Sequence, residues 1–301
     1  MIRATNITKK FDEFVAVDNM TCVIPKGSIY GLIGANGSGK STFVRMVTGV
    51  YNTDGGELTV DGESVYENIV IKAKMAYVPD ELYFVGGATM NRMAKLYAGI
   101  YPKFDREKFK ELTGMFGLNP KKSIGTFSKG MKRQAATILA LSCNPEYIFF
   151  DETFDGLDPV MRNLVKNLIA REVVENNATA IVTSHNLREL EDTCDQLALI
   201  YKGGVIFESD VQNLKTTMFK VQIAFGDEYD HTRFAEFELQ SFKKTGSVAN
   251  FVVRGEREQV TEQLSAMNPT LIDILPLSLE EVFVHEMSMQ GYSFKDILGT
   301  E

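Results

Sequence analysis

Apolar residues follow two different spacings along the chain, and the changes between them outline its organisation. Nearly continuous apolar runs over residues 28–33, 147–150 and 178–182 predict buried strands of a parallel sheet, because strands covered on both faces lose the alternation with polar residues. Residues 159–176 have helical spacing and lie between two of these runs, which predicts a βαβ unit. From about residue 88 to residue 142 the spacing is again helical, which predicts a helical insertion.

A different pattern begins near residue 211. It predicts a small α+β module with three strands, a helix, a strand and a helix, over residues 218–225, 237–243, 248–254, 256–267, 271–275 and 279–287. The expected fold class is therefore α/β with a second, smaller α+β module. We expect two domains, residues 1–210 and residues 211–301, with the helical insertion at about 88–142 as a subdomain of the first.

Composition and charge exclude several classes of protein. Of the 301 residues, 44% are hydrophobic, which is typical of a globular protein with a core. No apolar run approaches the roughly 20 residues that cross a bilayer, and the first residues lack the apolar core of a signal peptide. The net charge of −8 argues against a nucleic-acid partner. The three cysteines are far apart and without metal-ligand spacing, so we expect a reducing, cytoplasmic location.

The clearest chemical motif is Gly34-Ala35-Asn36-Gly37-Ser38-Gly39-Lys40-Ser41, which fits the phosphate-loop pattern G-x-x-x-x-G-K-[ST] between a predicted strand and a predicted helix. Glycines let backbone N–H groups turn toward phosphate, and the helix dipole adds to the attraction. Lys40 can reach the β- and γ-phosphates, and Ser41 can hold Mg²⁺. The motif predicts that a nucleoside triphosphate binds at Gly34, Asn36, Gly37, Ser38, Gly39, Lys40, Ser41 and Thr42.

A second motif is the pair of acids that ends the strand at residues 147–150. Asp151 and Glu152 follow this strand directly, and the carboxyl ends of parallel strands face the ligand crevice. Asp151 is placed to hold Mg²⁺, directly or through water. Glu152 is placed to polarise the attacking water as a general base. A pair of acids after a strand is commonly a solvated turn, and the phosphate loop upstream is what favours the catalytic interpretation here.

Three further motifs follow in a fixed order: Phe127-Ser128-Lys129-Gly130-Met131-Lys132-Arg133-Gln134, then Gly156-Leu157-Asp158-Pro159, then Thr183-Ser184-His185. With the phosphate loop and the acidic pair, they resemble the nucleotide-binding subunit of ATP-binding cassette (ABC) transporters over about residues 1–210. The resemblance implies a P-loop ATPase core with a helical subdomain. It implies that Ser128 and Gly130 of the signature motif clamp the γ-phosphate and that His185 contacts it. It also implies that the loop at Asp158 crosses to a partner subunit and that Phe11 stacks on adenine.

The sequence departs from the family pattern at three places. Asp80 stands where the family usually has a glutamine that senses Mg²⁺ and the attacking water. The aspartate is shorter and adds a charge, so a direct contact between Asp80 and the metal stays open. Thr153 replaces the proline after the acidic pair, which changes the stiffness of the loop rather than its chemistry. Lys129 and Met131 replace glycine and glutamine in the signature motif, as is familiar within the exporter branch.

The resemblance implies a mechanism in a head-to-tail dimer. Each ATP lies between Lys40 of one subunit and Ser128 of the other, with Mg²⁺ bound by Ser41 and Asp151. ATP closes the dimer, and hydrolysis with Glu152 as base releases it, which drives alternating access in a transmembrane permease. A homodimer has two competent sites, and a heterodimer with a related ATPase is the alternative. The expected location is the cytoplasmic face of the cell membrane.

The C-terminal module, ending in Leu277-Ser278-Leu279-Glu280-Glu281-Val282-Phe283, resembles the extension of ATPase subunits that serve separately encoded exporters of drugs, peptides, lipids or polysaccharides. The leading hypothesis is therefore the ATPase of an exporter. The alternatives are a soluble cassette ATPase outside transport, such as one in iron–sulfur cluster assembly, and a regulatory module that hydrolyses ATP poorly. The apolar run Leu82-Tyr83-Phe84-Val85 either docks the permease or packs within the insertion.

Overall fold

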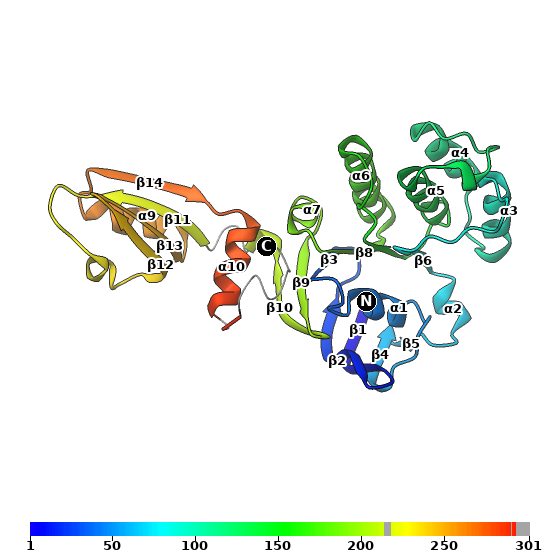
Figure 1. Ribbon diagram of the computed structural model, residues 1–301, viewed down its shortest axis with the longest axis horizontal. Coiled ribbons are helices and arrows are strands. Elements are labelled where there is room, and N and C mark those ends of the chain that lie inside the picture. The colour runs from blue at the N-terminus through cyan, green and yellow to red at the C-terminus, as the bar shows by residue number, and fades with distance from the viewer. Residues whose placement is uncertain (214–217, 290, 293–301) are drawn as a thin grey trace. The chain divides into compact units, whose positions relative to one another are not determined.

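Two structural units divide the chain in the computed structural model, which describes residues 1–213, 218–289 and 291–292. The first unit is Met1–Glu208 and the second is Ser209–Glu301. Figure 1 labels most of the helices and strands of both units.

The first unit contains two β-sheets. A four-stranded sheet has the order β2-β1-β4-β5, and a six-stranded sheet has the order β10-β9-β3-β8-β7-β6. The strands of the four-stranded sheet are β1 (Ile2–Phe11), β2 (Phe14–Ile24), β4 (Gly55–Val60) and β5 (Glu63–Ser64). Those of the six-stranded sheet are β3 (Ile29–Ile33), β6 (Met75–Val78), β7 (Tyr147–Asp151), β8 (Thr179–Ser184), β9 (Gln196–Tyr201) and β10 (Gly204–Asp210).

Parallel pairing in the six-stranded sheet aligns the strand ends that carry the sequence motifs. β3 pairs in parallel with β8 and with β9, and β7 pairs in parallel with β8 and with β6. Ile33 lies opposite Ser184, and Asp151 lies opposite Thr183. The phosphate loop, the acidic pair and His185 therefore leave the sheet at one edge. Every residue of β3, β7 and β8 is buried, which explains their continuous apolar runs.

The helices of the first unit lie on both sides of this sheet and, in the helical insertion, beyond its edge (Figure 1). They are α1 (Lys40–Val47), α2 (Ile69–Lys72), α3 (Met90–Ile100), α4 (Arg106–Met115), α5 (Lys129–Leu141), α6 (Pro159–Asn176), α7 (Leu187–Glu191) and a 3₁₀ helix, η1 (Ile124–Thr126). In the helical insertion, α5 packs against α3, against α4 and against strand β6. This packing joins the insertion to the edge of the sheet.

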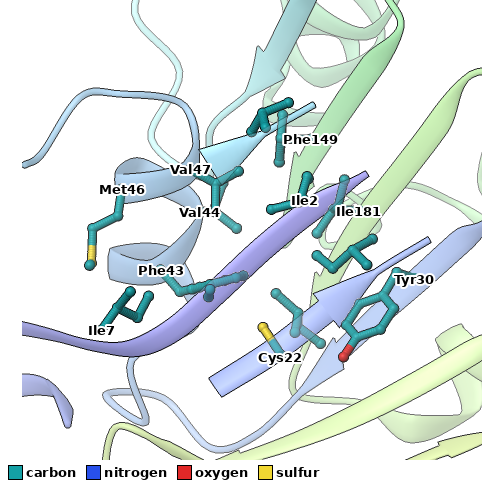
Figure 2. Packing of buried hydrophobic residues seen from close by; sticks show 14 of the residues in the cluster. Ile2, Ile7, Cys22, Tyr30, Phe43, Val44, Met46, Val47, Phe149 and Ile181 are labelled. Atoms are coloured by element: carbon teal, nitrogen blue, oxygen red, sulfur yellow. The ribbon is translucent and has the colours of Figure 1, made fainter. Parts of the chain in front are cut away.

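The main core of the first unit lies where α1 meets both sheets. Buried side chains of α1, such as Phe43 and Val44, cluster with Ile2 of β1 and with Phe149 and Ile181 of the parallel strands (Figure 2). Burying each large apolar side chain contributes about 1.5–3 kcal/mol. The cluster therefore fixes α1, and with it the phosphate loop that precedes α1, against the sheet.

The second unit is built on an antiparallel four-stranded sheet with the order β12-β13-β11-β14. Its elements are β11 (Met218–Ala224), η2 (His231–Phe234), β12 (Glu238–Thr245), β13 (Val248–Arg254), α9 (Arg257–Ala266), β14 (Leu271–Pro276) and α10 (Leu279–Met289). Val260 and Leu264 of α9 join Phe219, Val221 and Phe251 of the sheet in a core. An ion pair between Arg254 and Glu286 ties α10 to β13.

The expected elements are found with small differences at their ends. The βαβ unit is β7–α6–β8, and α6 spans the predicted residues 159–176. The strand and helix order of the C-terminal module is also as predicted, and the short 3₁₀ helix η2 was not expected. In α6, Pro159 occupies the first turn and Asp158 accepts hydrogen bonds from the backbone N–H groups of Val160 and Met161, each at 3.0 Å. These are strong local start signals for a helix.

Candidate functional site

The phosphate-loop residues form the turn between β3 and α1. Gly37 and Gly39 have φ of 81° and 111°, a region that favours glycine. A Cβ on Gly34 would lie 2.5 Å from the carbonyl oxygen of Ile200, so the close approach of the two backbones also requires glycine there. Gly39 is the N-cap of α1, and no side chain caps this helix. The first N–H groups of α1 are thus available to an anion.

Lys40 lies inside this loop and is only 4% exposed. Its Nζ donates to the carbonyl oxygens of Gly34, at 2.6 Å, and Ala35, at 3.1 Å. The same Nζ is 3.3 Å from Oε1 of Glu152. The ammonium group is therefore held at the centre of the loop, between the turn and the acidic strand end, where it can meet a bound phosphate. The neighbouring Ser38 has a buried Oγ with no hydrogen-bond partner among the described residues.

Asp151, at the end of β7, is fully buried and gathers three hydroxyl groups. Its Oδ1 accepts from Ser41 Oγ at 3.0 Å and from Thr183 Oγ1 at 2.7 Å, and its Oδ2 accepts from the Tyr77 hydroxyl at 3.2 Å. Burial, and then the charge of Asp151, raise the pKa of Tyr77, so this hydroxyl stays protonated as a donor. A carboxylate next to a serine hydroxyl is an oxygen set that suits Mg²⁺.

Glu152 follows in a left-handed backbone conformation, with φ of 48°. Its backbone N–H donates to Thr183 Oγ1 at 3.0 Å. Its carboxylate lies between Lys40 and His185. Oε1 faces Nζ of Lys40, and Oε2 is 3.0 Å from Nδ1 of His185. Asp155 also offers a carboxylate oxygen within 4.8 Å of ligand atoms of Glu152 and His185. The arrangement can orient one water molecule and accept its proton.

Ser128 and Gly130 lie at the start of α5, and Asp158 lies at the start of α6. Ser128 is the N-cap of α5 and accepts from the N–H of Met131 at 3.2 Å. A Cβ on Gly130 would lie 2.8 Å from the carbonyl oxygen of Gly156, so this helix start packs directly on the loop after β7. Among the hydrogen bonds of the described residues, none joins Ser128 or Asp158 to the phosphate loop.

The remaining predicted site residues lie outside the cluster formed by the phosphate loop and the acidic pair. Phe11 is 39% exposed, and its ring is edge-on to Tyr51 with 5.2 Å between centroids. Thr42 is half-buried in the first turn of α1, and Asn36 is exposed at the tip of the phosphate loop. Among the hydrogen bonds of the described residues, none joins Asp80 to Ser41 or Asp151. Its Oδ1 instead accepts from Arg133 at 2.5 Å.

Four residues of this region were not singled out from the sequence: Tyr77, Thr183, Asp155 and Arg133. Three of the four lie close in the sequence to predicted site residues. Thr183 is two residues before His185, Asp155 is three residues after Glu152, and Arg133 is part of the signature motif. Their contacts join distant parts of the chain, and no local pattern marks such contacts.

Comparison with known proteins identifies the family. Residues 17–155 match the sequence family described as ABC transporter. The ABC transporter ATP-binding protein YtrB of Bacillus subtilis (strain 168) is 28% identical over 284 residues, which cover 94% of this chain and 97% of the relative. The bacitracin transport ATP-binding protein BcrA of Bacillus licheniformis is 30% identical over 71% of each chain. The linearmycin resistance ATP-binding protein LnrL of Bacillus subtilis (strain 168) is 33% identical over 68% of each.

Solved structures share the fold. One is an ATP-binding subunit of an ABC transporter, with a TM-score of 0.66 and 22% identity over 71% of this chain and 92% of that chain. Another is an ATP-binding cassette in a dimeric post-hydrolysis state with ADP and Pi, with a TM-score of 0.64 and 21% identity over 70% of this chain and 99% of that chain. The relatives at 30% and 33% identity are each matched over more than two thirds of their length. This chain therefore belongs to the ABC transporter family, as an ATP-binding subunit that hydrolyses ATP.

Proposed function

We propose that this protein is the ATPase subunit of an exporter and that it powers a separately encoded transmembrane permease. The observation that carries the proposal is the naming of its relatives for bacitracin transport, linearmycin resistance and, in the case of YbhF of Escherichia coli (strain K12), probable multidrug transport. An antibiotic-like cargo is the class these names favour, within the broader set of drugs, peptides, lipids and polysaccharides.

The contacts in the first unit suggest a role for each site residue. Residues 1–210 would form the ATPase domain, with 211–301 as its accessory domain. Mg²⁺, held by Ser41 and Asp151, would neutralise charge on the β- and γ-phosphates. Lys40 would exchange its carbonyl partners for phosphate oxygens, because a phosphate offers it a full opposite charge. Glu152 would accept the proton of the attacking water, and His185, 3.0 Å from it, would orient Glu152 and meet the γ-phosphate.

A second subunit would complete each site. Lys40, Ser41, Asp151, Glu152 and His185 are brought together, whereas Ser128, Gly130 and Asp158 form a separate group. A head-to-tail dimer places the signature group of one copy over the phosphate loop of the other. Because one chain carries both groups, a homodimer would have two complete sites, and a related ATPase subunit could take the place of one copy.

Exposed apolar residues near β6 offer a surface for the permease. Ile69 and Val70 of α2 are 81% and 71% exposed, and Tyr83, shortly after β6, is 87% exposed. Exposure of Tyr83 favours docking of a partner over packing within the insertion. Among the described residues, no helix is both long and apolar enough to cross a bilayer. The proposed place of action is the cytoplasmic face of the cell membrane, where the protein would be bound to its permease.

Copurification of the Glu152→Gln variant tests this proposal. The variant should bind ATP, fail to hydrolyse it and remain as an ATP-bound dimer, since the amide keeps the shape of Glu152 but not its basicity. From detergent-solubilised native membranes with MgATP, we expect it to recover a polytopic membrane protein in stoichiometric amount. Lys40→Ala, which should lose most ATP binding, is the matched control. Recovery of only soluble scaffold proteins would favour the alternative in iron–sulfur cluster assembly.

A further inference from the structure

Arg133 is an unusual residue in the core of the helical insertion. It lies in the second turn of α5, and its side chain is fully buried, the largest one so buried among the described residues. Its Nη2 donates to Oδ1 of Asp80 at 2.5 Å, whereas Nε and Nη1 have no hydrogen-bond partner among the described residues. A buried charge is costly unless it is paired. Asp80 therefore supplies the charge that keeps the Arg133 guanidinium in this position.

Asp80 connects Arg133, and therefore helix α5, to the six-stranded sheet. It follows the end of β6 by two residues and is 48% exposed on its side chain. α5 packs against β6, and the ion pair joins the second turn of this helix to a residue just past the carboxyl end of the strand. The glutamine that the family usually has at this position would leave the Arg133 charge without a counter-ion.

The ion pair is one link in a continuous path of contacts. Asp151 accepts from the hydroxyl of Tyr77, which lies on β6 three residues before Asp80. Asp80 pairs with Arg133, and Ser128 caps the same helix five residues earlier. A single strand end and a single helix start thus connect the buried carboxylate of the site with the signature motif. The contact of Tyr77 with Asp151 and that of Arg133 with Asp80 are both partly buried, so displacement at one of them is resisted at the other.

We propose that Arg133 is a positioning residue for ATP hydrolysis, which uses Asp80 to fix the signature helix α5 against the end of β6. In this arrangement Asp80 serves Arg133 and is not a ligand of the metal. The role concerns hydrolysis itself, so it holds whether or not the protein serves an exporter. It also assigns a purpose to the exchange of glutamine for aspartate at residue 80.

A double-mutant cycle on the full chain tests the proposal. The variants are Asp80→Asn, Arg133→Met and the double variant, with Arg133→Lys as the conservative change that keeps the charge. We expect each of the first two to lower kcat about tenfold, with the KM for ATP within about twofold of the parent value. The double variant should be no slower than the slower single variant, because both remove the same contact. Arg133→Lys should recover a large part of kcat.

Two measurements distinguish this positioning role from metal binding by Asp80 and from a purely structural role. The Mg²⁺ concentration for half-maximal activity should be unchanged in Asp80→Asn. A raised Mg²⁺ requirement in Asp80→Asn alone would make Asp80 a metal ligand and overturn the proposal. Thermal unfolding gives the folded fraction of each variant. If kcat per folded molecule stays at the parent value in every variant, the role of Arg133 is purely structural and the proposal is wrong. If Arg133→Met does not fold, Arg133→Gln, which also removes the charge, takes its place in the cycle. A kcat loss from Asp80→Asn that is as large in the Arg133→Gln background as in the parent would refute the coupling.

Discussion

Thr183 is the residue whose substitution should reveal how the site is held together. Its side chain is fully buried at the end of β8. Its Oγ1 donates to Asp151 Oδ1 at 2.7 Å and accepts from the backbone N–H of Glu152 at 3.0 Å. One hydroxyl therefore holds both acids of the motif. The Thr183→Val substitution keeps the shape of the side chain and removes both hydrogen bonds.

The expected cost follows from these two contacts. A hydrogen bond to a charged group contributes about 1.5–3 kcal/mol, and a buried N–H left without a partner costs about 1–3 kcal/mol. Some relaxation of the loop after β7 is expected, so we predict a loss of about 3 kcal/mol in the free energy of unfolding. Glu152 sits at φ 48°, a conformation that costs about 1–2 kcal/mol for a non-glycine residue. Without its anchor the Glu152 backbone should relax, and a displacement of the base should lower kcat by tenfold or more.

Urea unfolding of the full chain and steady-state ATPase assays check this prediction. Thr183→Ser is the matched control, because it keeps the hydroxyl and removes only a methyl group, at a cost of about 1 kcal/mol. We expect Thr183→Ser to keep most of its kcat and Thr183→Val to lose it, with a similar KM for ATP in both. If the two variants have equal stability and equal kcat, the hydroxyl of Thr183 does not hold the acidic pair and the reasoning fails.

Three further predictions concern other parts of the first unit. Phe11→Ala should raise the KM for ATP about fivefold or more with little change in kcat, because base stacking on an aromatic ring contributes about 1–3 kcal/mol; an unchanged KM would remove Phe11 from the adenine site. Burial opposes ionisation of Asp61, yet hydrogen bonds from the N-terminal ammonium and from Tyr147 lower its pKa to about 2. The stabilising effect of ionised Asp61 should thus be complete above about pH 4 and be lost as the pH falls toward 2. In urea unfolding, Asp61→Asn should therefore lower the free energy of unfolding at pH 7 but much less at pH 2.5. An equal loss at both pH values would contradict this. Gly130→Ala should lower kcat severalfold, because the added Cβ would lie 2.8 Å from a backbone carbonyl oxygen of the loop after β7; Gly114→Ala, where a Cβ meets nothing within 4 Å, should keep full activity in the same assay.

Much of the fold and part of the site could be predicted because their determinants are local. A parallel strand buried on both faces has a continuous apolar run, as in β7, and a helix such as α6 carries its start signal in Asp158 and Pro159. The phosphate loop needs glycines at fixed spacings from Lys40, since the backbone must turn over a few consecutive residues. In these cases the structural feature depends on residues that are close together in the sequence, so the local pattern is sufficient to predict it.

The contacts that the sequence did not reveal are long-range and pair residues that have no pattern of their own. Tyr77 reaches Asp151 across 74 positions, and Arg133 reaches Asp80 across 53. The composition of the signature motif gives no sign that Arg133 points inward, because an arginine near a helix start is usually solvated. Packing of α5 on β6 buries it, and only then does a single negative charge at residue 80 become necessary. An aspartate that departs from the family pattern is therefore explained by the environment of a second residue, and a variant at either position has to be interpreted together with the other.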